Sequence, residues 1–141
     1  MGSEFIHVGV IFQKPLPGGA IVLTERHIAI RSGNAQWLPR NFEIWMFTWP
    51  KLVWSFEHIS RKARLFVSYE EPWRKFRVLA YQRSVRNYNM QIYRKYLSSM
   101  KTGALWKFIA VQIAYLPTRF CIGLCNVYFI FKGVPLPYPK N

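Results

Sequence analysis

The side chains that could carry out catalysis or bind a metal are few in this sequence and lie far apart along it. The histidines His7, His27 and His58 have no cysteine, histidine or aspartate at the spacing of a metal site. Cys121 and Cys125 are four residues apart, which places them on one face of a helix rather than in a disulfide loop. We therefore expect no catalytic site, no metal site and no cofactor.

The chemistry that the sequence does favour is the binding of anions. The chain has 20 lysines and arginines against 6 acidic residues, all of them glutamates, and the last of these is Glu71. Residues 72–141 contain 12 basic residues and no acidic one. An excess of this kind predicts an anionic partner: acidic phospholipid, RNA, or an acidic surface of a neighbouring subunit. We assign contacts with lipid phosphates or acidic neighbours to Arg86, Arg94, Lys95, Lys101 and Lys107.

An apolar run covers residues 108–131, FIAVQIAYLPTRFCIGLCNVYFIF, with Arg119 as its single charge. A helix of this length would extend about 36 Å, enough to cross a hydrocarbon core of about 30 Å. We therefore predict a transmembrane helix over residues 104–132. Its apolar residues supply on the order of −5 kcal/mol of insertion energy, and Arg119 costs roughly 3 kcal/mol.

The cost of placing an arginine in the bilayer predicts specific roles for Arg119 and Pro117. Arg119 would pair with an acid or with backbone carbonyls of another membrane subunit, and Pro117 would kink the helix. The alternative is that residues 108–131 form the core of a soluble basic protein, with Arg119 reaching the surface or RNA.

The region before the span, residues 36–103, has the pattern of amphipathic helices that are rich in basic and aromatic residues. Apolar residues at helical spacing predict one helix over residues 50–68 and a second over residues 73–100. Tryptophans are common where membrane meets water, so we interpret Trp45, Trp49 and Trp106 as interfacial anchors. The aromatic run at residues 36–50 could instead pack against a partner subunit.

The two ends of the chain are predicted to be extended. Residues 6–12 and 20–30 are rich in β-branched residues and flank a loop of prolines and glycines, so residues 1–35 read as an extended or β-hairpin arm. Residues 133–141 form a proline-rich tail. The predicted fold class is mainly α, with two amphipathic basic helices, one kinked C-terminal transmembrane helix and this N-terminal arm.

The residues from Tyr88 to Arg119 carry a resemblance to a known family. The basic and aromatic stretch NYNMQIYRKYLSSMKTG leads directly into the apolar run, which resembles subunit f of the mitochondrial ATP synthase membrane sector. The resemblance implies a structural accessory subunit of an inner-membrane complex of oxidative phosphorylation, either this ATP synthase sector or a respiratory complex. Such a subunit would support assembly and contact cardiolipin.

The distribution of positive charge predicts how such a span would be oriented. Lysines and arginines are dense before the run, whereas only Lys132 and Lys140 follow it. The positive-inside rule then places the N-terminal part on the matrix side and the C-terminus in the intermembrane space.

The alternative function is an RNA-binding mitochondrial ribosomal protein. Arginines alternate with aromatic residues in RKFRVLAYQRSVRNYNMQIYRKY, a composition suited to phosphate neutralisation and base stacking. The sequence has neither the glycine-containing core motif of an RNA-recognition motif nor the loop of a KH domain.

The pairing predicted for Arg119 can be tested with Arg119→Leu. Removing a charge that costs roughly 3 kcal/mol in the bilayer should leave membrane insertion intact or improve it. Loss of the partner contact should weaken assembly into the complex, which blue-native gel electrophoresis would measure. Full incorporation of the variant would contradict the pairing.

Overall fold

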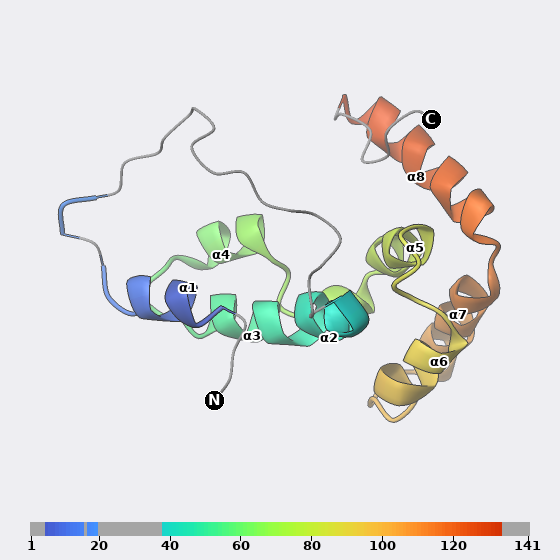
Figure 1. Ribbon diagram of the computed structural model, residues 1–141, viewed down its shortest axis with the longest axis horizontal. Helices are drawn as coiled ribbons and strands as arrows, with labels where there is room; N and C mark the ends of the chain where they lie inside the picture. The colour runs from blue at the N-terminus through green and yellow to red at the C-terminus, as the bar shows by residue number, and fades with distance from the viewer. Residues whose placement is uncertain (1–4, 16, 20–37, 134–141) are drawn as a thin grey trace. The chain divides into compact units, whose positions relative to one another are not determined.

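The computed structural model describes residues 5–15, 17–19 and 38–133. The chain forms two compact units, Met1–Glu70 and Glu71–Asn141. Within the described ranges the secondary structure is helical and contains no strand, so the prediction of a mainly α protein is confirmed (Figure 1).

The prediction that residues 6–12 are extended is wrong, because helix α1 covers Ile6–Ile11. Packing within the first unit explains the difference. A Cβ at Gly9 would lie 3.5 Å from Leu52 Cδ1, an ordinary packing distance, so this part of α1 lies against Leu52. The Phe5 ring centroid lies 4.8 Å from that of Trp49. These contacts outweigh the strand preference of β-branched residues. The second predicted strand, residues 20–30, lies outside the described residues, as do residues 134–141 of the predicted tail.

The aromatic run of the first unit forms consecutive helical turns. They are the 3₁₀ turn η1 (Leu38–Arg40), α2 (Asn41–Glu43), the π-helical turn η2 (Ile44–Thr48) and α3 (Trp49–Trp54). Pro50 has no N–H to donate to the Met46 carbonyl, and the wider π turn lies where that hydrogen bond is missing.

The single helix predicted over residues 50–68 is wrong, because α3 ends at Trp54 and α4 covers Arg61–Val67. The Ser60 side chain caps α4 by accepting a hydrogen bond from the Ala63 N–H at 3.3 Å. Arg64 Nη1 donates to the Trp54 carbonyl at 3.0 Å, and Trp54 Nε1 donates to the Ser68 carbonyl at 3.1 Å. These bonds hold α4 against the end of α3.

The single helix predicted over residues 73–100 is also wrong. The second unit instead has the 3₁₀ turn η3 (Pro72–Arg74), α5 (Phe76–Ser84), α6 (Met90–Ile92) and the π turn η4 (Tyr93–Leu97). Arg86 has a φ of 65°, a left-handed conformation that ends α5 and reverses the chain. The Asn89 side chain then caps α6 by accepting from the Ile92 N–H at 3.0 Å.

The second unit is completed by α7 (Ala104–Tyr115) and α8 (Thr118–Phe131), and α5 packs against both (Figure 1). Tyr88 is fully buried, and its hydroxyl donates a hydrogen bond to the Ala110 carbonyl at 3.0 Å. Burial, and to a smaller extent the neighbouring Tyr93, raises the pKa of Tyr88 well above its usual range. The chain reversal after α5 is therefore anchored to the middle of α7.

Tyr88→Phe tests this anchor, with Tyr115→Phe as the control because Tyr115 is 65% exposed. Losing the buried hydrogen bond should lower the free energy of unfolding by about 1 kcal/mol, measured by urea denaturation. Because the pKa of Tyr88 is raised in the folded state, the unfolded chain loses the phenol proton at a lower pH than the folded chain. The stabilisation by the buried neutral phenol is therefore complete at neutral pH and is lost as the pH rises above about 10. The variant should therefore lose less stability at alkaline pH than the native chain. Equal urea midpoints for both variants would contradict the prediction.

Candidate functional site

A sharp elbow between α7 and α8 is the most distinctive feature of the second unit. The helices have 12 and 14 residues, and the pair is bent by 107° at Leu116 and Pro117. Pro117 cannot donate a backbone hydrogen bond, and α8 starts anew when the Phe120 and Cys121 N–H groups bond to its carbonyl. Where the sequence predicts one kinked helix, the structure thus has two helices.

The elbow bears directly on the predicted membrane span. No single helix in the described ranges combines the length and the apolar character needed to cross a bilayer. The bent pair of α7 and α8 meets both criteria only when the two helices are taken together.

One side chain, Arg83, holds the elbow. Its Nε donates to the Leu116 carbonyl at 2.8 Å, and its Nη1 donates to the Tyr88 carbonyl at 3.3 Å. The Leu116 carbonyl follows the last turn of α7, where carbonyls have no intrahelical partner and the helix dipole is negative. A guanidinium placed there satisfies this carbonyl and complements the dipole.

Arg83 is not among the functional residues predicted from the sequence, although the sequence contains a signal for it. Leu79, the most deeply buried residue of α5, lies one helical turn before Arg83. An arginine on the same face as a buried leucine lies close to the core, where its guanidinium can donate to buried carbonyls. From the sequence alone, Arg83 cannot be distinguished from the other basic residues of the same stretch.

The inner face of α8 packs against α5. Cys121 and Cys125 lie on this face, are buried and are both free thiols. The Cys125 Sγ lies 3.7 Å from the Ser84 Oγ, and the Phe129 ring lies 6.5 Å from the Tyr81 ring. The two cysteines therefore share a helix face, as their spacing predicted.

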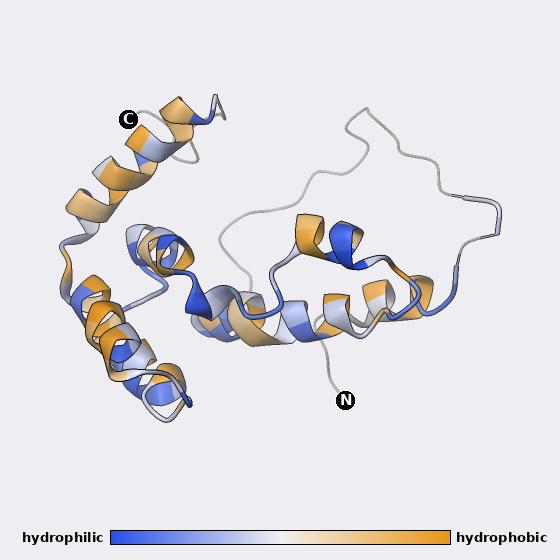
Figure 2. Cartoon of the chain, turned by 180° about the vertical axis from the view of Figure 1, so that it is seen from behind, coloured by the Kyte–Doolittle hydropathy of each residue, from blue (hydrophilic) through white to orange (hydrophobic). Residues whose placement is uncertain are grey.

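The outer face of α8 is apolar and exposed. Phe120, Leu124, Val127 and Phe131 recur at helical spacing and are 54%, 49%, 52% and 87% exposed, respectively. We call these four residues the outer stripe. The α7–α8 pair is predominantly hydrophobic along its length (Figure 2). Continuous exposed apolar surface of this kind is typical of a site that meets another protein or a membrane.

The five cations predicted to bind anions come from different elements. Arg86, Arg94, Lys95 and Lys101 are exposed, and Lys107 is half-buried. Lys107 Nζ donates to the Ser98 carbonyl at 2.9 Å, and Lys95 Nζ lies 4.8 Å from the centre of the Tyr96 ring. At least Lys107 thus has a structural role, and the binding of anions by the set stays a prediction.

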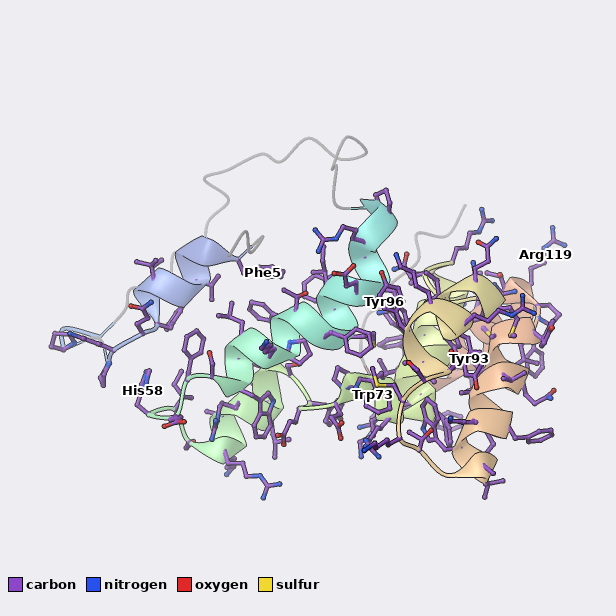
Figure 3. All side chains as sticks on the ribbon, turned by 90° about the horizontal axis from the view of Figure 1, so that it is seen from below. Phe5, His58, Trp73, Tyr93, Tyr96 and Arg119 are labelled. Atoms are coloured by element: carbon purple, nitrogen blue, oxygen red, sulfur yellow. The ribbon has the colours of Figure 1, made fainter. Side chains whose placement is uncertain are left out.

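The predicted aromatic anchors fall in both units. In the second unit, Trp106 Nε1 donates to the Arg74 carbonyl at 3.2 Å, and the Trp106 ring lies edge-on to Trp73 at 5.6 Å. In the first unit, Trp45 and Trp49 both pack against Phe5, which is labelled in Figure 3. All three tryptophans thus contribute to packing, and their role as interfacial anchors stays a prediction.

Arg119 lies in the first turn of α8, and its side chain points away from the helix (Figure 3). It is exposed and forms no ion pair with any acid in the described part of the chain. The positive end of the helix dipole disfavours a cation at this position. No contact within the described part of the second unit therefore accounts for Arg119, and its pairing with another subunit stays a prediction.

Comparisons with protein-family models, with curated proteins and with solved structures give no match for this chain. Among the described residues, histidines, cysteines and acids form no group of three or more that could hold a metal ion. The features of the chain that point to a function are therefore the elbow, the outer stripe and the distribution of charge.

Arg83→Gln tests the role of the guanidinium, with the exposed Arg94→Gln as a control that removes the same charge. Losing charged hydrogen bonds to two carbonyls should cost about 2 kcal/mol of stability. The angle between α7 and α8 should also become less well defined. Spin labels at the exposed positions Leu105 and Ile130 would show a broader distance distribution in Arg83→Gln alone. The same broadening in Arg94→Gln would contradict a specific role of Arg83.

Proposed function

We propose that this chain is a non-catalytic structural subunit that binds a membrane through α7 and α8. The outer stripe is the observation that carries the proposal, because it exposes large apolar side chains on a helix of a strongly basic unit. In water such a surface is costly, and a lipid bilayer would remove it from water.

Charge supports the choice of a membrane as the partner. Beyond Glu71 the chain has 12 basic residues and no acidic residue. Cations next to an anionic lipid surface gain about 1 kcal/mol each. Apolar side chains and nearby lysines and arginines together are the combination that binds helices to anionic bilayers. RNA would neutralise the charge but would leave the outer stripe in water.

The choice of a particular membrane and of a particular complex rests on the resemblance to subunit f. On that basis we propose the mitochondrial inner membrane, with cardiolipin and other subunits of an oxidative-phosphorylation complex as partners. The predicted single span over residues 104–132, with opposite ends on the matrix and intermembrane sides, would require α7 and α8 to align through Leu116 and Pro117.

Leu124→Asp tests membrane binding through the outer stripe. The control is Leu65→Asp, because Leu65 of the first unit is 42% exposed and Leu124 is 49% exposed. An aspartate costs about 3 kcal/mol at the bilayer centre, and half of that at the interface would lower binding roughly tenfold. Flotation with vesicles of phosphatidylcholine and cardiolipin would measure the bound fraction. Equal flotation of the native chain and Leu124→Asp would contradict the assignment.

The same preparation separates a lipid partner from RNA. Membrane-bound chain should resist nuclease and be released by detergent. Vesicles of phosphatidylcholine alone should bind it less well, and added salt should weaken binding to cardiolipin vesicles. Sedimentation with ribosomal particles that nuclease abolishes, together with failure to float with vesicles, would overturn the proposal in favour of RNA binding.

A further inference from the structure

We infer that α7 and α8 bind one leaflet of an anionic bilayer from one side, with α8 lying along the interface, and that they do not cross it. This inference rests on the proposed membrane binding. It differs from the sequence prediction, in which the two ends of the apolar run lie on opposite sides.

The dimensions of the elbow are the first argument. At 1.5 Å per residue, α7 is about 18 Å long and α8 about 21 Å long, so neither reaches across a hydrocarbon core of about 30 Å. With a bend of 107°, the far ends of the pair lie about 23 Å apart. In this conformation the pair is too short to span.

The position of α5 is the second argument. The inner face of α8 lies against α5 through Cys125 and Ser84, and through Phe129 and Tyr81. Helix α5 contains Arg77 and Arg83, and Arg86 follows its end. An upright α8 that kept these contacts would carry arginines into the hydrocarbon, at roughly 3 kcal/mol or more for each. With α8 lying flat, α5 stays on the aqueous side.

The two faces of α8 fit this orientation. At 100° per residue, the outer stripe is centred opposite the buried face that contains Cys121 and Cys125. Arg119 lies about 100° from the centre of the stripe, at the edge of the exposed arc, where a long cationic side chain can reach lipid phosphate. An anionic leaflet therefore matches the apolar stripe and the cation at its edge at the same time.

The inference is tested by labelling single cysteines on either side of the elbow. Ser99→Cys precedes α7 and Lys132→Cys follows α8, and both positions are exposed. Each full-length variant is added to preformed vesicles that contain cardiolipin, and the vesicles are recovered by flotation. An impermeant maleimide is then applied before or after detergent. The native chain is the blank, because Cys121 and Cys125 are buried.

Binding from one side predicts that both cysteines react equally before and after detergent. Protection of Lys132→Cys before detergent, alone or together with Ser99→Cys, would overturn the inference while leaving membrane binding intact. Absence of the native chain from the floated fraction would overturn the proposed function itself, and the inference with it.

The variant Pro117→Ala combined with Arg83→Gln gives an independent check. Alanine restores the N–H that can bond to the Ile113 carbonyl, and residues 104–131 could then form one helix of about 42 Å. In this background, labelling of Lys132→Cys before detergent should fall severalfold. Unchanged labelling would overturn the claim that the elbow keeps the pair on one side.

Discussion

The second unit depends on the hydrogen bond from Arg83 to the carbonyl of Leu116. Pro117 interrupts the helical hydrogen-bond pattern, and the end of α7 is left with carbonyls that need donors. The guanidinium supplies one donor there at 2.8 Å and another to the Tyr88 carbonyl at 3.3 Å. One side chain of α5 thus connects the elbow to the chain reversal after α5. Because Tyr88 in turn bonds to Ala110, the reversal is also fastened to the middle of α7.

This arrangement gives α8 two different faces. Its sequence is apolar almost all round, with Arg119 and Asn126 as the main exceptions, so the pattern alone does not say which side is buried. Contact with α5 buries the cysteine face and leaves Phe120, Leu124, Val127 and Phe131 exposed. A uniformly apolar helix is typical of a membrane span, whereas a helix with one face already covered by a basic neighbour is suited to the membrane surface.

The sequence predicted the helical class correctly and overestimated the length of the helices. Apolar residues at helical spacing continue across residues 55–60 and 85–89, although α3 and α5 end there. The spacing of apolar residues does not reveal where α3 and α5 end. A chain that reverses onto its own core still needs apolar residues on both sides of the turn. The left-handed Arg86 is not a residue type that marks a turn. The strand predicted for residues 6–12 failed for a related reason, since α1 packs against residues far along the chain, with Phe5 next to Trp49 and Gly9 next to Leu52.

The sequence by itself determined the helical class, the charge asymmetry between the halves, the shared face of the two cysteines and the apolar run that contains Pro117. These properties follow from composition and local spacing. Only the tertiary structure decided that the run bends by 107°, which face of α8 is covered, and that Arg83 has a partner at the end of α7. The reason is distance along the chain: Arg83 and Leu116 are 33 residues apart, and only the packing of α5 against α7 and α8 brings them together.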